Sequence, residues 1–185
     1  MALKEILTEP NKLLREKSLA VEKVDEDLQK LMNDMLETMY MAPGIGLAAI
    51  QVGIPKRVIV LDIGWREKSE STNDEKQVAR KNPMHFVNPE IITKSTNNST
   101  YEEGCLSVPG QFAEIERPDK CHIKYLDYYG QPKELVAEGM LATCIQHEID
   151  HLEGILFIDY LSKLKKSMIV KKLTKQKEQL DRIVI

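Results

Sequence analysis

Residues 146–151 read Gln-His-Glu-Ile-Asp-His, so two histidines lie four residues apart near the end of the chain. On a helix, side chains at this spacing project from one face with their Cβ atoms about 5–6 Å apart, and both imidazoles can reach one metal ion. Glu148 directly follows the first histidine. This gives the pattern H-E-x-x-H, in which the histidines bind a divalent metal and the glutamate handles the proton of a water molecule. The pattern predicts a hydrolase that acts on a carbonyl compound.

Apolar residues recur at helical spacing through the same segment, at Leu141, Cys144, Ile145, Ile149 and Leu152. This pattern predicts a helix that packs against a core, with the two histidines at or beside the apolar stripe. Burial of two imidazoles and a carboxylate without partners would be unfavourable, and a shared metal ion would satisfy all three groups. We therefore prefer a metal site to the alternative of a solvated polar helix face.

A third metal ligand is needed, because a catalytic zinc-type site usually has three protein ligands and one position open to water. The extended metalloprotease pattern requires histidine at position 157, where this chain has Phe157. The only glutamates after His151 are Glu153, which is too close, and Glu178, which lies in a basic tail. The third ligand is therefore expected upstream of the motif.

The three cysteines have no close pairs, so they do not form a disulfide framework, and they fit a reducing cytosol. Cys144 lies on the apolar stripe and Cys121 lies within a predicted strand, so packing accounts for both. Cys105 follows Gly104 and precedes a Ser-Val-Pro-Gly run that breaks the strand, which would present its thiol at a strand end. That thiol could be a metal ligand or a nucleophile. The histidines of the motif are better explained as its co-ligands than as its base.

Length and composition indicate one globular domain, since the chain has 185 residues, of which 42% are apolar and 30% are charged. No apolar run is long enough for a signal peptide or a membrane span, so we expect a cytoplasmic protein with no membrane partner. Residues 161–185 carry a net charge of +6 in a chain of net charge −3. Such a basic end is typical of a solvated helix face, and contact with an anionic surface such as ribosomal RNA is the alternative.

The order of the predicted elements indicates an α+β domain. A helix is predicted from capping residues 25–27 to a break at 42–44, and strands are predicted over 57–62, 85–92 and 121–127, with a turn at 97–99. The helix with the histidines follows, and a last helix begins near Leu161. We therefore expect antiparallel sheets packed around a central helix that carries the H-E-x-x-H motif, with an N-terminal and a C-terminal helix. Residues 65–82 are polar and aperiodic, and we interpret them as an exposed insertion of unassigned role.

Three segments of the chain resemble the motifs of bacterial peptide deformylases. Residues 44–51 match G-x-G-x-A-A-x-Q, residues 103–107 read Glu-Gly-Cys-Leu-Ser, and residues 146–151 match Q-H-E-x-D-H. All three motifs are intact and in order, and the resemblance spans most of the chain, with 65–82 the least covered part. It implies a single catalytic domain over residues 1–185 that removes the N-formyl group from the initiator N-formylmethionine of nascent polypeptides and releases formate. It also implies a bacterial, cytoplasmic protein.

The resemblance further implies the roles of single residues. The metal ligands would be Cys105, His147 and His151, and Glu148 would be the acid/base. The oxyanion donors would be the side-chain amide of Gln51 and the backbone N–H of Leu106. One divalent metal per chain is implied, with Fe²⁺ as the native ion and Zn²⁺, Ni²⁺ or Co²⁺ as substitutes. The C-terminal helix would dock on the ribosome, and we expect a monomer with no DNA partner.

The substrate pocket can be predicted in part from positions along the chain. Met140 and Cys144 precede the first histidine of the motif by seven and three residues, so they share its helix face and can line an apolar pocket suited to an unbranched methionine side chain. Ile45 could close this pocket, although all three residues could instead be plain core. Gly46 and Gly104 would let an extended peptide pair with the backbone.

Two other classes of protein compete with this interpretation. A zinc endopeptidase shares H-E-x-x-H, but it leaves Cys105 and Gln51 without roles. A non-catalytic, metal-stabilised binding protein gives Glu148 no reason to be acidic, and structural zinc sites usually take four protein ligands. Glu103 and Arg117 flank the cysteine loop, and we predict that they form an ion pair that holds it.

Overall fold

The computed structural model describes residues 2–64 and 81–183, so the predicted insertion at 65–82 lies outside the described residues except for its last two. In chain order the elements are η1 (Lys12–Arg15), α1 (Glu26–Met41), β1 (Gly46–Ala48), η2 (Ala49–Val52), β2 (Val58–Leu61), β3 (Met84–Lys94), β4 (Asn98–Cys105), β5 (Val108–Pro118), β6 (Lys120–Leu126), β7 (Pro132–Glu138), α2 (Gly139–Leu152), η3 (Phe157–Tyr160) and α3 (Lys163–Ile183).

Helix α1 begins and ends where its sequence predicts. The side chain of Asp25 caps its first turn by accepting a hydrogen bond from the Leu28 backbone N–H at 3.1 Å. The helix ends at Met41, two residues before Pro43. Met32, Met35 and Met39 and the leucines of α1 are buried in a core cluster with residues of β1 and β2, whereas Met41 at the end of the helix is exposed. The three buried methionines therefore fill the core, as their spacing predicts.

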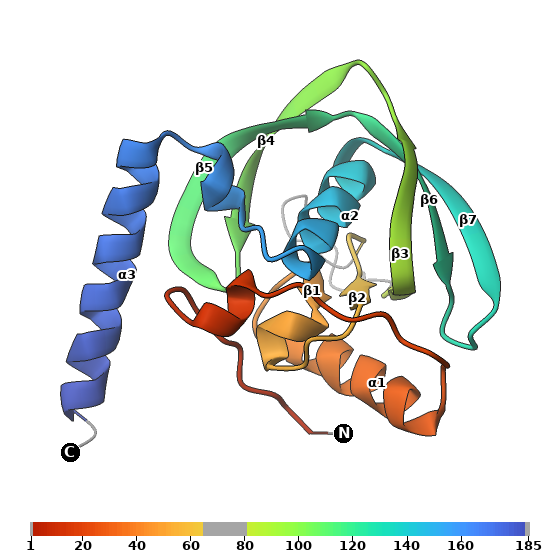
Figure 1. Cartoon of the computed structure of the whole chain (residues 1–185), viewed down its shortest axis with the longest axis horizontal. Coiled ribbons are helices and arrows are strands. Elements are labelled where there is room, and N and C mark those ends of the chain that lie inside the picture. Colours follow the sequence, from red (N-terminus) through yellow and green to blue (C-terminus); the bar gives the residue numbers. More distant parts are fainter. Residues whose placement is uncertain (1, 65–80, 184–185) are drawn as a thin grey trace, which may run out of the picture.

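Two antiparallel sheets surround α2, which confirms the predicted α+β class. Five strands pair in the order β1-β2-β3-β6-β7, and β4 pairs with β5 in a separate two-stranded ribbon. In Figure 1, α2 lies at the centre of the molecule, between this ribbon and strands β3, β6 and β7. The helix that carries the histidines is therefore enclosed by sheet on more than one side.

The core around α2 consists of side chains from the helix and from the five-stranded sheet. Ala142, Ile145 and Leu152 are fully buried. They belong to one apolar cluster with Ile59, Leu61, Phe86 and Ile123. Truncation of one such leucine or isoleucine to alanine typically costs about 2–5 kcal/mol of stability. This packing fixes the helix axis and hence the direction in which its polar side chains point.

Two details of the strands differ from the prediction. The turn predicted at 97–99 is wrong by two residues, because Asn98 and Ser99 already pair with Pro118 and Arg117 and the chain reverses at 95–97. Strands β1 and β5 have no counterpart among the predicted strands, and neither does β7. The apolar run of β7 is only three residues long between charged neighbours, and its pairing with β6 along its whole length decides its conformation.

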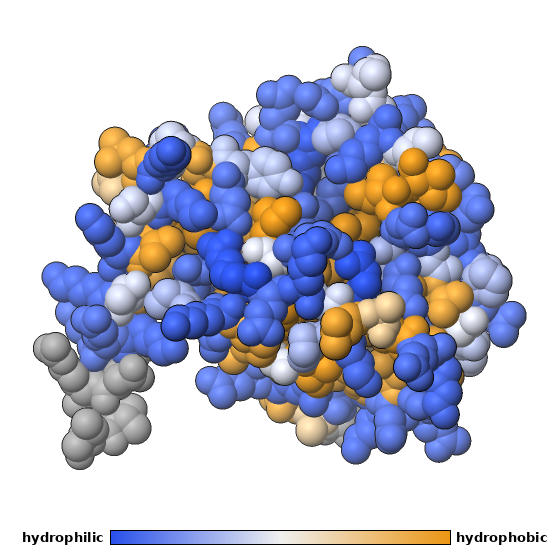
Figure 2. Space-filling view, viewed as in Figure 1, coloured by the Kyte–Doolittle hydropathy of each residue, from blue (hydrophilic) through white to orange (hydrophobic). Residues whose placement is uncertain are grey.

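Helix α3 lies at the edge of the molecule and attaches through one face (Figure 1). Leu173 is buried, and Ile169 and Val170 pack with it against Phe157 and Ile158 of η3. In Figure 2, apolar side chains gather over the end of α3 nearest η3, and further apolar groups lie among hydrophilic ones on the right and lower parts of this face. No helix in the described parts of the chain has both the length and the apolar character needed to cross a membrane.

Candidate metal centre

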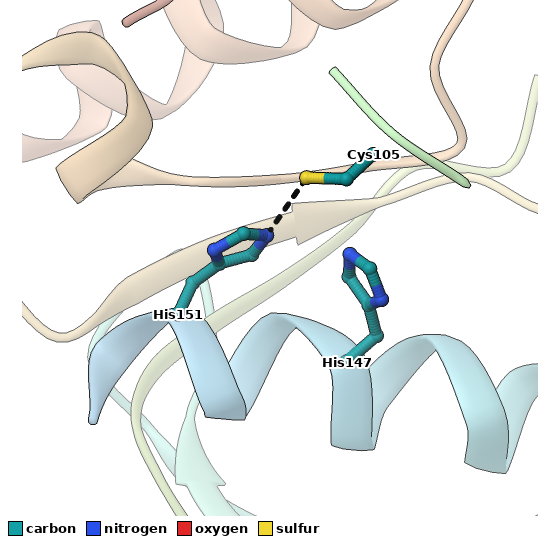
Figure 3. Close-up of side chains that lie close together, drawn as sticks. All are labelled: Cys105, His147 and His151. Atoms are coloured by element: carbon teal, nitrogen blue, oxygen red, sulfur yellow. Dashed lines mark hydrogen bonds between the residues drawn. The ribbon is translucent and has the colours of Figure 1, made fainter. Parts of the chain in front are cut away.

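The side chains of Cys105, His147 and His151 converge, and one ligand atom from each lies within 4.8 Å of the other two. Figure 3 shows the two imidazoles rising from α2 toward the cysteine, which approaches from the opposite side. The Cys105 Sγ lies 3.3 Å from Nε2 of His151, and the two imidazole centroids are 5.0 Å apart. The structure therefore brings together the three predicted ligands.

The position of Cys105 follows from the end of strand β4. The ladder between β4 and β5 shifts register after Gly104, and Cys105 then pairs with Val108 across a tight turn. Two donors face the sulfur from this turn and from η2: the Ser107 backbone N–H at 3.4 Å and Nε2 of Gln51 at 3.5 Å. These two contacts fix the position of the sulfur at the end of the strand.

His147 is oriented by a carboxylate on its far side. Its Nδ1–H donates to Oε2 of Glu103 at 2.8 Å, so Nε2 is left to face the cluster. Burial alone would lower the pKa of His147, but its hydrogen bonds with Cys105 and Glu103 outweigh burial and raise this pKa well above its ordinary value. For His151, burial and the nearby charge of His147 lower the pKa well below its ordinary value. The two imidazoles therefore differ in their protonation behaviour although they lie one helical turn apart.

The predicted ion pair between Glu103 and Arg117 is confirmed. Arg117 donates from Nε to Oε1 of Glu103 at 2.5 Å and from Nη2 to Oε2 at 3.0 Å, a two-point contact between almost fully buried groups. Burial by itself would raise the pKa of Glu103, yet the hydrogen bonds from His147 and Arg117 lower it. Glu103 therefore stays ionised and can keep hold of the imidazole.

Glu148 is buried beside the histidines and points into the same space. Burial raises its pKa to about 7. Within the described part of the chain, its Oε2 has no hydrogen-bond partner. A Cβ atom at Gly46 would collide with Oε1 of Glu148, so the missing side chain at Gly46 makes room for this carboxylate. This contact is a further constraint on Gly46, besides the predicted pairing with an extended peptide.

Gln51 and Leu106, the predicted oxyanion donors, both lie beside the cluster. Gln51 is held at both ends of its amide: Oε1 accepts from the Ala48 backbone N–H at 2.8 Å, and Nε2 donates to Oγ of Ser107 at 3.0 Å. Leu106 occupies the turn directly after Cys105. Both residues line the cleft that contains the cluster. Their role as donors stays a prediction.

A cleft of about 890 Å³ opens over the cluster, within the usual range for small-molecule sites, roughly 300–1,000 Å³. All five predicted substrate-binding residues line it: Ile45, Gly46, Gly104, Met140 and Cys144. Cys144 is buried in its wall, and burial raises the pKa of its thiol to about 12, so the thiol is neutral. Met140 is partly exposed at the same cleft. The geometry agrees with the predicted pocket without testing what binds there.

Sequence reasoning missed several residues of the site. Phe112, which is 67% exposed, lies against Gly104, where a Cβ atom would meet its ring. Ser107 is fully buried and contacts both Gln51 and Cys105. The contact of Glu103 with His147 was also missed, although residues two apart on a strand share a face and Glu103 precedes Cys105 by two. Phe112 and Ser107 gave no such signal, since their contacts depend on how the turn folds.

The donor set fits a divalent metal ion. One sulfur and two imidazole nitrogens are ligands that suit Zn²⁺ and Fe²⁺. The second nitrogen of one imidazole is held by a carboxylate, as is usual for a metal-binding histidine. A buried polar atom beside the cluster, Oε2 of Glu148, has no hydrogen-bond partner among the described residues. Unpartnered buried polar atoms are uncommon in folded proteins, and they are expected where an ion or water binds.

An α+β domain in which a central helix brings H-E-x-x-H to a cysteine thiol, beside a buried glutamate and an open cleft, defines a metallohydrolase. Comparison with known proteins gives the family. A family model described as polypeptide deformylase matches residues 3–167. The chain therefore belongs to the polypeptide deformylase family, and it is an enzyme that removes the N-formyl group from nascent peptides.

Individual relatives agree over nearly the whole chain. A peptide deformylase of Pelagibacter ubique (strain HTCC1062) is 61% identical over 185 residues, which is 100% of both chains. One of Maricaulis maris (strain MCS10) is 56% identical and covers 98% of each chain. The crystal structure of peptide deformylase from Ehrlichia chaffeensis is similar with a TM-score of 0.86 at 43% identity, and it covers 97% of this chain and 99% of its own. These comparisons confirm the resemblance drawn from the three motifs.

Proposed function

We propose that this chain removes the formyl group from N-formylmethionyl peptides with the help of a metal ion bound by Cys105, His147 and His151. The observation that carries the proposal is the convergence of one sulfur and two ring nitrogens, from two separate motifs, within 4.8 Å of one another. When bound, a divalent metal ion acts as a Lewis acid that makes a water molecule acidic and polarises a carbonyl group. The protein's own residues supply the remaining chemistry.

Glu148 is proposed as the acid/base. Its carboxylate takes the proton of the attacking water and passes it to the nitrogen of the leaving amine. A group that does both is most effective when its pKa lies near the working pH, and burial raises the pKa of Glu148 to about 7. Oε2 of Glu148 has no protein partner among the described residues, so it is available to accept this proton.

Gln51 and Leu106 are proposed to stabilise the oxyanion that develops on the formyl oxygen. The amide of Gln51 is held by Ala48 and Ser107, so its orientation is set before the substrate arrives. Nε2 of Gln51 lies 3.5 Å from the sulfur of Cys105, and this proximity to a proposed metal ligand supports the proposed role. Loss of one preorganised donor typically lowers the rate about 10²–10³-fold.

The methionine side chain is proposed to enter the pocket between Ile45, Met140 and Cys144. The neutral thiol of Cys144 gives this pocket an apolar wall. Gly46 belongs to β1, the edge strand of the five-stranded sheet, and Gly104 belongs to β4 of the ribbon. An extended peptide between these two strands could form backbone hydrogen bonds with both, while the pocket selects the first side chain.

Fe²⁺ is proposed as the native ion, one per chain, with Zn²⁺, Ni²⁺ or Co²⁺ as substitutes, since the sulfur and nitrogen donors suit all four. We further propose that residues 1–185 act as one catalytic domain, as a monomer in the bacterial cytoplasm.

The exposed lysines of α3, such as Lys165 and Lys171, support a contact with the ribosome through electrostatic attraction to RNA. Each of these points remains open to test.

The proposal is tested by measuring formate release from a formyl-Met peptide with protein purified anaerobically, while metal content is read on the same sample. Glu148→Ala serves as the matched variant, because it removes the acid/base and leaves the three ligands in place. We expect formate from the wild-type protein only, with metal bound in both. A protein that binds Fe²⁺, Ni²⁺ or Co²⁺ and releases no formate with any of them would refute the proposal.

The endopeptidase alternative is tested in the same experiment. An N-acetylated peptide with several internal bonds is incubated with the metal-loaded wild-type protein, and products are separated by mass. Cleavage of internal bonds would favour an endopeptidase. We expect the acetylated peptide to remain intact while the formylated one reacts.

A further inference from the structure

Tyr160 is the last residue of η3, two residues short of the start of α3, and its side chain contacts the helix that carries the histidines. Its hydroxyl donates to Oδ2 of Asp150 at 2.8 Å. Its ring covers the guanidinium of Arg117, with Cζ of Arg117 lying 4.8 Å from the ring centroid. Tyr160 thus contacts both members of the ion pair between Arg117 and Asp150, next to the metal centre. Tyr160 itself is 50% exposed.

Arg117 joins Tyr160 to Glu103. Nη1 of Arg117 donates to the same Oδ2 of Asp150 at 2.7 Å, while Nε and Nη2 donate to Glu103. The side chain of Arg117 is only 4% exposed and that of Asp150 17% exposed, so these contacts are largely shielded from water. The planar guanidinium cannot satisfy both carboxylates unless its orientation is fixed.

The series of contacts ends at a candidate metal ligand. Glu103 accepts from Nδ1–H of His147 at 2.8 Å, and its position depends on the two hydrogen bonds from Arg117. The contacts therefore run without a break from Tyr160 through Asp150 and Arg117 to Glu103 and then to the imidazole. Every step is a hydrogen bond or a contact between a ring and a cation.

We propose that Tyr160 is a positioning residue for His147, and that it acts by holding Arg117 against Glu103 and Asp150. The inference rests on the proposed role of His147 as a metal ligand. Without the ring and hydroxyl of Tyr160, the Arg117 side chain would be open to water on the side where it meets Asp150. Water would then compete for its N–H groups, Glu103 would be held less firmly, and the His147 ring would leave its ligating orientation more often.

A plain packing role for Tyr160 makes a different prediction. A residue that is half exposed buries little apolar surface, so its loss through packing alone should lower the stability of the metal-free protein slightly and leave metal retention unchanged. A positioning role changes the rate at which the metal is lost. Residues that orient a ligand directly typically contribute about 10–100-fold to metal affinity or activity, so a residue further away should contribute less, about 3–10-fold.

The test measures metal loss from the zinc-loaded, full-length protein mixed with an excess of a colorimetric chelator. Three variants are compared with the wild type. Tyr160→Leu removes both the ring and the hydroxyl, Tyr160→Phe removes the hydroxyl alone, and Tyr129→Leu makes the same change at another exposed tyrosine, in the turn before β7. Thermal unfolding of each metal-free protein is recorded in parallel, so that a general loss of stability is detected.

We expect Tyr160→Leu to lose zinc about 10-fold faster than the wild type and Tyr160→Phe about 3-fold faster, because the phenylalanine ring still covers Arg117. Tyr129→Leu should match the wild type. Equal rates in the wild type and both Tyr160 variants would overturn the inference, whether or not the metal-free proteins are less stable. Equal acceleration in Tyr129→Leu would overturn it as well.

The same experiment separates this inference from the proposed function. If the wild-type protein binds no metal at all, the role of His147 as a ligand fails, and both conclusions fall together. If the wild type binds zinc and releases formate while the Tyr160 variants retain zinc equally well, only the positioning role of Tyr160 is wrong. Co²⁺-loaded samples add an independent signal, since their visible absorption depends on ligand geometry and should change in Tyr160→Leu.

Discussion

The carboxylate of Glu148 occupies space that is available only because Gly46 has no side chain. Gly46 lies in β1 and Glu148 in α2, so this contact joins the edge of the five-stranded sheet to the central helix. The glycine therefore helps to set the position of the proposed acid/base, in addition to any backbone contact it makes with a peptide.

Replacement of Gly46 by alanine should displace the Glu148 carboxylate. The added methyl group would also meet the Leu61 side chain, so the carboxylate, as the more mobile neighbour, would move. General acid–base catalysis contributes about 10²–10⁴-fold, and we expect kcat of Gly46→Ala to fall about 10²-fold. Metal content should be unchanged, because the ligands are untouched. A kcat within twofold of wild type, measured by formate release, would show that Glu148 does not depend on this space.

Glu103→Gln should weaken metal binding. The amide oxygen can still accept the hydrogen bond from His147, but the negative charge that holds the imidazole and pairs with Arg117 is lost. Such changes typically lower metal affinity about 10–100-fold, which competition with a chelator would measure. Glu114→Gln is the matched control, since Glu114 is an exposed glutamate on β5 of the same ribbon. Unchanged affinity in Glu103→Gln would mean that the carboxylate does not orient His147.

Cys144→Leu should change which first residue the enzyme accepts. The cysteine forms part of the pocket wall, and extra methylene groups in a packed site typically cost about 1–3 kcal/mol. We expect kcat/KM for a formyl-Met peptide to fall about 10-fold, while that for a formyl-Ala peptide changes little. The ratio of the two rates serves as an internal control for folding. If both substrates lose activity to the same degree, Cys144 does not line the methionine pocket.

Protonation of Asp159 in acid should make the fold less stable. Burial would raise its pKa, but hydrogen bonds from Lys166, the Leu156 N–H and Arg15 outweigh burial and lower it. A carboxylate whose pKa is lower in the folded state stabilises the fold fully above its unfolded pKa, about 4, and this contribution is lost as the pH falls through the folded value. Urea unfolding of the metal-free wild type and Asp159→Asn should therefore differ at pH 7 and converge well below pH 4. If the free energies of unfolding of the two proteins differed by the same amount at every pH, Asp159 would not be the source of the acid sensitivity.

The sequence was sufficient to predict the parts of the site that depend on local spacing. His147 and Glu148 precede His151 by four and three residues, and on a helix this spacing alone places the side chains close together. The position of Cys105 could be predicted because glycine and proline mark the end of its strand. The bounds of α1 followed from Asp25 and Pro43 for the same local reason.

Contacts between distant parts of the chain could not be predicted in this way. Tyr160 contacts Arg117 only because η3 folds back onto α2 and the ribbon. The sequence patterns of these segments do not indicate that contact. Gly46 was expected to contact a peptide, and its contact with Glu148 appears only once β1 and α2 are placed together. Strand β7 was missed because its pairing with β6, not its composition, determines its conformation.

The three proposed ligands lie on two separate parts of the fold: Cys105 at the end of the ribbon strand β4 and the histidines on α2. Any ion bound there is a cross-link between segments more than forty residues apart in sequence. A ligand present at one hundred times its dissociation constant stabilises the folded state by about 2.7 kcal/mol. The metal supply of the cell would then govern how long each molecule survives proteolysis, as well as how fast it works.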